Sequence, residues 1–248
     1  MAQEASSKAI SLPRIHVGTS GWGYPSWKPE FYPKDVPQKK FLPYYASVFN
    51  AVEVNYSFRQ MLKAKTIGDW LQQTPEHFMF AVKAHQQITH IKRLRNAEDS
   101  VKFFTSSIEP LFTAKRLGPI LIQLPPNLKG DVGLLREFLT IWPRAVRCTF
   151  EFRHTSWFND EIYETLRERN CALCIAENEE LKTPEVLTAD FAYFRLRRPD
   201  YSADERQAIA AHLRELAVDR EVFAFFKHEE NPQSAVWARE VLDAAIAS

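Results

Sequence analysis

The stretch TFEFRHTSWF, residues 149–158, begins with alternating apolar and charged side chains. Successive side chains of a strand point to opposite faces, so Phe150 and Phe152 share one face while Glu151 and Arg153 share the other. The phenylalanines indicate a hydrophobic strand, and the preceding residues, Ala145 to Cys148, look mostly buried too. A carboxylate and a guanidinium side by side on one face of such a strand require a special environment, and the rest of the chain indicates which one.

Short apolar runs rich in β-branched and aromatic residues recur along the chain, and amphipathic segments with helical periodicity lie between them. This alternation predicts β-α-β units with a parallel sheet, and eight units predict an α/β fold of the single-domain (β/α)₈ TIM-barrel type. An open doubly wound sheet is the alternative, but GTSGWG after the first run lacks the G-x-G-x-x-G spacing. The eight runs are IHVGT (15–19), AVEVN (51–55), FMFAVK (78–83), PILIQLP (119–125), RCTFEFR (147–153), CALCIA (171–176), FAYFRLR (191–197) and EVFAFFK (221–227).

The segments between the runs set the predicted helices and the domain bounds. Residues 1–14 are expected to form a disordered lead-in and residues 15–248 one barrel domain. The connection after CALCIA is short and broken by Pro184, so its helix is doubtful. Helices are predicted within residues 39–50, 64–73, 99–118, 131–142, 159–170, 203–218 and 234–247.

Composition excludes several classes of protein. The 248 residues are 45% hydrophobic and carry a formal net charge of +1, so no global field favours nucleic acid or an anionic membrane. No apolar run approaches the roughly 18 residues that span a bilayer, and the N-terminus lacks the apolar centre of a signal peptide. We therefore expect a cytoplasmic protein without membrane partners; its oligomeric state is not predicted.

The three cysteines are interpreted as core residues. An odd number in a chain of this length argues against a disulfide scaffold. Cys171 and Cys174 form a C-x-x-C, but on a strand this spacing places the two thiols on opposite faces.

Strand parity predicts a charged inward face at the carboxyl ends of the strands. Where the bulky apolar set of each strand packs outward against helices, the other set faces the barrel axis, and enzymes with this fold build their sites at that end. The two carboxylates are assigned there against four cations, Lys83, Arg153, Arg195 and Lys227, which leaves a local excess of positive charge. The inward polar residues are Glu53, Asn55, Lys83, Gln123, Glu151, Arg153, Arg195 and Arg197, and Lys227 shares the parity of Phe223 and Phe225.

This face suggests acid/base chemistry on a small anionic substrate. Glu53 and Glu151 are the candidate general acid and base, and Lys83 is either a Schiff-base nucleophile or an ion partner for Glu53 on the adjacent strand. A purely structural ion network is the alternative interpretation. The candidate substrate-binding residues are Trp22, Asn55, His90, Gln123, Arg153, Trp157, Arg195 and Lys227.

Other chemistries receive less support from the sequence. We predict no metal and no cofactor, because Glu53, Glu151, His85 and His90 match no ligand spacing. A glycoside hydrolase needs two carboxyl groups roughly 5–9.5 Å apart, and Glu53 and Glu151 lie three strands apart. A non-catalytic anion- or nucleic-acid-binding module is the alternative function, motivated by Arg197, Arg198 and the basic run 92–95.

A set of motifs resembles the YecE-like family, also called domain of unknown function 72. The resemblance runs from about Ile15 to the end of the chain and implies a TIM barrel related to sugar isomerases. The motifs are GTSGW (18–22), FYP (31–33), VEVN (52–55), KA (83–84), TH (89–90), LGPILIQLPP (117–126), EFRHTSW (151–157) and FRL (194–196).

Three positions depart from the family pattern, and all lie at the predicted mouth of the barrel. The family commonly has Asp after the sixth strand, His-Gly after the seventh-strand Arg-Leu, and Asn residues after the eighth strand. This chain instead reads Ala176-Glu177-Asn178, Arg197-Arg198 and Lys227-His228. The departures imply either a more anionic ligand than that of the relatives or the loss of their chemistry.

Overall fold

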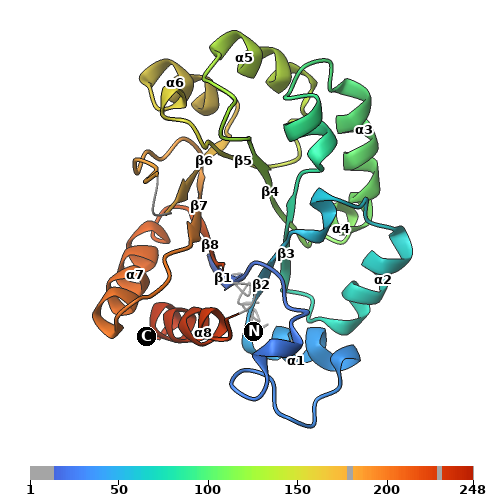
Figure 1. Ribbon diagram of the computed structural model, residues 1–248, viewed down its shortest axis with the longest axis vertical. Helices are drawn as coiled ribbons and strands as arrows, with labels where there is room; N and C mark the ends of the chain where they lie inside the picture. Colours follow the sequence, from blue (N-terminus) through green and yellow to red (C-terminus); the bar gives the residue numbers. More distant parts are fainter. Residues whose placement is uncertain (1–13, 178–180, 228–230, 248) are drawn as a thin grey trace, which may run out of the picture.

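A computed structural model describes residues 14–177, 181–227 and 231–247 (Figure 1). The predicted lead-in therefore lies almost entirely outside the described residues, as do Asn178 and His228.

The eight predicted strands form one parallel sheet that curls into a nearly closed barrel, in the order β1-β8-β7-β6-β5-β4-β3-β2. Figure 1 looks into this ring and shows the helices outside it. The predicted TIM-barrel fold is confirmed. The strands are β1 (Ile15–Thr19), β2 (Ala51–Val54), β3 (Met79–Lys83), β4 (Leu117–Gln123), β5 (Cys148–Glu151), β6 (Ala172–Ala176), β7 (Phe191–Leu196) and β8 (Glu221–Phe226).

The helices follow the predicted segments with one difference. The segment 99–118 forms two helices because Pro110 starts a second one, and its last residues already belong to β4. The α-helices are α1 (Phe41–Val48), α2 (Ala64–Gln73), α3 (Glu98–Ser107), α4 (Glu109–Thr113), α5 (Val132–Ile141), α6 (Asp160–Arg167), α7 (Ala203–Leu216) and α8 (Gln233–Ile246). The short turns are η1 (Pro25–Trp27), η2 (Gln38–Lys40), η3 (Tyr56–Phe58), η4 (Gln87–Ile91, π-helical) and η5 (Thr155–Trp157).

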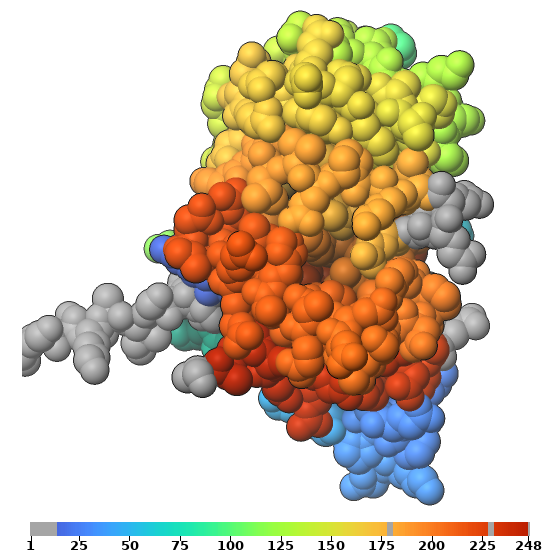
Figure 2. Space-filling model, turned by 90° about the vertical axis from the view of Figure 1, so that its left-hand side faces the viewer, coloured from blue at the N-terminus to red at the C-terminus, as the bar shows by residue number. Residues whose placement is uncertain are grey.

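The connection between β6 and β7 interrupts the outer ring. Its described residues, 177 and 181–190, contain no helix, which agrees with the break expected at Pro184. Phe194, Leu196 and Ile209 line a cavity of 410 Å³ at this place. Figure 2 views this side of the molecule, with α6 (yellow) above α7 (orange).

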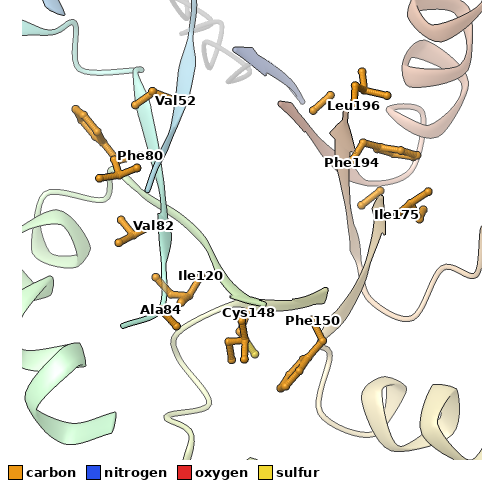
Figure 3. Packing of buried hydrophobic residues seen from close by; sticks show 14 of the residues in the cluster. Val52, Phe80, Val82, Ala84, Ile120, Cys148, Phe150, Ile175, Phe194 and Leu196 are labelled. Carbon is orange, nitrogen blue, oxygen red and sulfur yellow. The ribbon is translucent and has the colours of Figure 1, made fainter. Parts of the chain in front are cut away.

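The two faces of the strands follow the predicted alternation. Val52, Phe80, Ile120, Phe150 and Phe194 belong to the large core cluster beneath the helices, and Figure 3 shows their side chains pointing away from the barrel axis. A smaller cluster fills the interior of the barrel, and its members are Ala51, Ala81, Leu121, Ala172, Cys174, Ala176, Phe191, Tyr193, Phe223 and Phe225.

The cysteines are core residues, as predicted. Cys171 lies in the outer cluster and Cys174 in the inner one, so their thiols occupy opposite faces. All three thiols are free and buried.

The barrel closes between β1 and β2 through side chains. The ladder there is reduced to one isolated bridge, Ser20 to Glu53. The Tyr45 hydroxyl accepts from the Thr19 backbone N–H at 2.7 Å and donates to the Ala51 carbonyl at 3.1 Å. The Asn50 amide makes the equivalent link, accepting from Val17 N–H at 3.0 Å and donating to the Ile15 carbonyl at 2.7 Å. We call these contacts the β1–β2 seam.

Gly18 is required by the close approach at the seam. A Cβ atom at this position would lie 2.0 Å from the Ala51 carbonyl oxygen and 2.6 Å from the Tyr45 hydroxyl. Backbone and a buried ring cannot move aside as a flexible side chain can, so any larger residue must spread β1 from β2.

Gly18→Ala is therefore expected to lower the free energy of unfolding by about 1–3 kcal/mol, the range typical of overpacked sites. Urea denaturation monitored by circular dichroism measures the effect. Gly68→Ala is the matched control, since a Cβ atom added there would meet nothing within 4 Å and alanine favours helix α2. The control should be unchanged or slightly stabilised; equal losses in the two variants would contradict the role of the seam.

Candidate functional site

The centre of the predicted site is the guanidinium of Arg195 on β7. Its Nη2 donates to Glu53 Oε1 on β2 at 2.8 Å, and its Nη1 pairs with Glu151 Oε2 on β5. All three side chains are buried, with Arg195 fully so. One cation thus joins two strands across the barrel interior. The wide separation of the two carboxylates expected from strand order is therefore wrong, because a distance across a barrel is shorter than the path along its wall.

Glu53 is held as a carboxylate by four donors. Besides Arg195, it accepts from the hydroxyls of Ser20 at 2.6 Å and Tyr193 at 2.8 Å, and from Asn55 Nδ2 at 3.3 Å. Burial alone would raise the pKa of Glu53, but Arg195 and the hydroxyl hydrogen bonds outweigh it and keep the pKa below its ordinary value.

Glu151 is surrounded by three arginines. Arg153 donates from Nε to Glu151 Oε1 at 2.7 Å, and Arg197 donates to the same oxygen at 3.3 Å. Burial raises the pKa of Glu151, but Arg195, Arg153 and Arg197 together lower it to about 2. At neutral pH neither carboxylate holds a proton to give, and a base of such low pKa is a weak one. This favours an electrostatic role for both glutamates over the predicted acid/base role.

Lys83 at the end of β3 does not pair with Glu53, so the predicted ion pair is wrong. Among the described residues, no carboxylate lies within 4.0 Å of its Nζ. The Nζ donates to Gln123 Oε1 at 3.0 Å and lies 4.2 Å from the centre of the Phe58 ring. Burial and then Arg195 lower the pKa of Lys83 to about 7, although Glu151 and Glu53 act in the opposite direction. Lys83 is thus the group of this site that titrates near neutrality.

The rim above these residues is cationic and partly exposed. The side chains of Arg153 and Arg197 are 22% and 17% exposed. Lys227 follows β8 and lies near enough to Lys83 to influence its charge. His90 in η4 packs edge-on against Phe58, with ring centres 4.9 Å apart. Burial, Lys83 and Arg153 lower the pKa of His90, so its imidazole is neutral at pH 7.

An aromatic cavity of 440 Å³ lies between the segments that follow β1 and β2 and helix α2. Trp22 and Trp70 line it and meet edge-to-face, with centroids 5.2 Å apart. Asn55 also lines it, and its Oδ1 is buried without a hydrogen-bond partner among the described residues. Because Asn55 Nδ2 contacts Glu53, this residue connects the aromatic cavity to the charged centre.

Two of the predicted substrate-binding residues are not available to a ligand. Trp157 is fully buried, stacks on Phe152 and donates its indole N–H to the Leu128 carbonyl at 2.8 Å. It packs the loop after β5 onto the outer core. Arg195 is also fully buried, and it binds the two glutamates instead of an external anion.

The structure also adds residues that the predicted set omits. Ser20 and Tyr193 lie at inward-facing positions of the alternation along β1 and β7, so the two-residue periodicity of side chains in a strand could have identified them. Arg197 has the right parity too, and its contact with Glu151 places it at the site. Tyr56 and Trp70 come from a turn and a helix, and strand parity gives no signal for them.

The described residues contain no group of three or more His, Cys, Asp and Glu side chains that could hold a metal ion. Their helices are all too short or too polar to span a bilayer.

Comparison with known families gives one match over almost the whole chain. Residues 16–247 match the family described as "Protein of unknown function DUF72". UPF0759 protein YunF of Bacillus subtilis (strain 168) is 32% identical over 161 residues, which are 60% of this chain and 54% of the relative. UPF0759 protein YecE of Escherichia coli (strain K12) is 30% identical over 145 residues, 58% of this chain and 50% of the relative. The matched region thus spans about half the length of these curated relatives.

Solved structures agree with the fold. A DUF72 family protein from Thermotoga maritima MSB8 has a TM-score of 0.82 at 28% identity, over 92% of this chain and 98% of that chain. A family 2 AP endonuclease from Brucella melitensis has a TM-score of 0.55 at 13% identity, over 96% and 100%. At such low identity the second likeness shows the barrel fold alone.

Arg195→Met is expected to lower the free energy of unfolding by about 3–5 kcal/mol at pH 7, because two buried carboxylates lose their shared cation. In the wild type both pKa values are lowered, so this stabilisation is complete above pH 4.5 and is lost as the pH falls toward 2. In the variant, burial dominates and Glu53 binds a proton more readily. The difference between variant and wild type should therefore narrow from pH 7 to pH 5.

Urea denaturation at several pH values measures this difference. Arg136→Met is the control, since Arg136 contacts Glu161 at 3.6 Å on the surface and should contribute little. A deficit for Arg195→Met that does not change with pH would argue against the coupling of Arg195 to the carboxylates.

Proposed function

We propose that this chain, which belongs to the DUF72 family, is an enzyme that binds a small anionic, sugar-like or phosphorylated substrate at the carboxyl-terminal mouth of its barrel. The observation that carries the proposal is the excess of guanidinium groups around the two buried glutamates. Three arginines face two carboxylates there, and Lys83 adds further positive charge whenever it is protonated.

The rim arginines have the geometry to bind an anion. Arg153 and Arg197 share a single oxygen of Glu151, and each guanidinium has five N–H donors. Arg197 makes one hydrogen bond within the described residues and is partly exposed, so it can turn its remaining donors toward a phosphate or carboxylate. A partly buried cation in excess is stabilised when a ligand supplies the missing negative charge.

The proposed reaction is proton transfer, as in an isomerase or lyase. Lys83 has a pKa of about 7, which suits a group that exchanges protons at neutral pH. The ionised Glu53 and Glu151 then stabilise positive charge instead of moving protons. The aromatic cavity beside them could receive an apolar or ring-shaped part of the substrate by stacking.

A non-catalytic anion- or nucleic-acid-binding module is the competing proposal, and several contacts weigh against it. Arg93 donates to the Asn127 carbonyl at 2.9 Å, and Arg95 lies 3.5 Å from Asp131. Arg198 pairs with Glu205 at 2.5 Å. These basic residues are engaged within the protein, so a small anion at the rim is the better-supported ligand.

Calorimetric titration with sugar phosphates, sugar acids and inorganic phosphate tests the proposal. We expect Arg197→Gln to weaken binding about tenfold or more, because one charge-assisted hydrogen bond contributes roughly 1.5–3 kcal/mol. Arg136→Gln is the matched control and should bind like the wild type, since Arg136 lies on the outer helix α5.

Two results would contradict the proposal. Equal affinity of the Arg197→Gln and Arg136→Gln variants would show that Arg197 at the rim does not contribute to anion binding. Binding of an oligonucleotide instead, with a steep decrease of affinity as salt is raised, would support the nucleic-acid module.

A further inference from the structure

We propose that Lys83 forms an imine with the carbonyl carbon of an aldehyde or ketone substrate that also carries a phosphate or carboxylate group. This inference rests on the proposed function, because it uses the same site and assigns the anionic group of the substrate to the rim arginines. It adds the class of substrate and a covalent step.

Lys83 lacks a carboxylate partner among the described residues. Glu53 and Glu151 are the two buried carboxylates of the described barrel interior, and Arg195 forms an ion pair with each of them. An ordinary buried lysine is kept as an ammonium ion by a carboxylate. Lys83 is instead bonded to the neutral amide oxygen of Gln123, at 3.0 Å.

These contacts leave the lone pair of the neutral amine free. A neutral amine has two N–H groups and one lone pair. Gln123 Oε1 accepts one N–H, and the other side of Nζ lies over the apolar Phe58 ring at 4.2 Å. Neither partner is a donor aimed at the nitrogen, so neither uses the lone pair, and the Phe58 ring face favours the ammonium form that is in equilibrium with the amine.

The charged neighbours support a neutral amine at working pH. Arg195 from β7 and Lys227 after β8 oppose a further positive charge, and burial acts in the same sense; Glu151 from β5 and Glu53 from β2 oppose them only in part. With a pKa of about 7, a substantial fraction of the Lys83 side chains is neutral at pH 7. For a lysine in water the neutral fraction is roughly one in a few thousand.

The reaction balances without an added oxidant or reductant. The Nζ lone pair forms a C–N bond to the carbonyl carbon, and a proton moves from nitrogen to the carbonyl oxygen to give a carbinolamine. Loss of that oxygen as water, with one proton taken up from solvent, breaks the C–O bond and leaves the protonated C=N bond of the imine. The protonated imine accepts electrons from the adjacent carbon, which is the step that an isomerase or a lyase requires.

Reductive trapping tests the inference. Wild-type protein is incubated with sodium cyanoborohydride and dihydroxyacetone phosphate, glyceraldehyde 3-phosphate or pyruvate, and the adduct is located by peptide mass spectrometry. We expect a stable secondary amine on Lys83, at a level at least tenfold above that on the exposed Lys63 and Lys129 in the same sample. Uncharged dihydroxyacetone should label Lys83 much less, because the rim arginines cannot hold it.

Two variants sharpen the test. Lys83→Arg keeps the positive charge and should abolish the specific adduct while anion binding is retained. Gln123→Glu places a carboxylate against Nζ and should move the half-maximal pH of labelling upward from about 7, because a nearby negative charge favours the ammonium form. Gln123 acts here as a positioning residue, and a merely structural role would leave this pH profile unchanged.

The outcomes separate this inference from the proposed function. Calorimetric binding of the anions without an adduct on Lys83 would overturn the imine and leave the proposed function in place. Labelling spread equally over surface lysines would also overturn it. Neither binding nor labelling would overturn both. An adduct confined to Lys83 that shifts in pH with Gln123→Glu would support both.

Discussion

The bridge from Arg195 to Glu53 and Glu151 determines the character of the whole site. A buried guanidinium requires negative partners, and two buried carboxylates require a cation, so the three groups satisfy one another across the barrel axis. The consequence falls on their neighbours. Lys83 is left without a carboxylate partner among the described residues and loses its ordinary basicity, while Arg153 and Arg197 must share one oxygen of Glu151.

Much of this arrangement could be predicted from the sequence. The alternation of side chains along each strand and the number of strands can both be read from local sequence patterns. The inward positions of Glu53, Lys83, Gln123 and Glu151 follow from the apolar residues beside them. Which inward groups meet could not be predicted, because partners across a barrel depend on the depth of each residue. Lys83 and Glu53 lie on adjacent strands, yet the longer Arg195 reaches Glu53 from β7, which is separated from β2 by β1 and β8.

The aromatic residues show a second limit of the sequence. Trp22 and Trp157 both follow strands and look alike in the sequence, but Trp22 lines a cavity and Trp157 fills the outer core. The difference lies in the path of each loop and in the hydrogen bond of the Trp157 indole to Leu128. Trp70 belongs to α2, whose position outside the barrel wall, against Phe80 of β3, is a property of the tertiary packing.

The β1–β2 seam makes the closure of the barrel depend on side chains. Elsewhere, widening the ring would break a ladder of backbone hydrogen bonds, whereas here two side chains, Tyr45 and Asn50, span the distance. Tyr45 is fully buried, and each of the two side chains makes two hydrogen bonds to the backbone, so neither can turn without giving them up. The aromatic cavity lies directly above this seam, between Gly21 and Asn55. The same two strands carry Ser20 and Glu53, which hydrogen-bond across the seam, so the seam fixes the floor of the aromatic cavity and one side of the charged centre together.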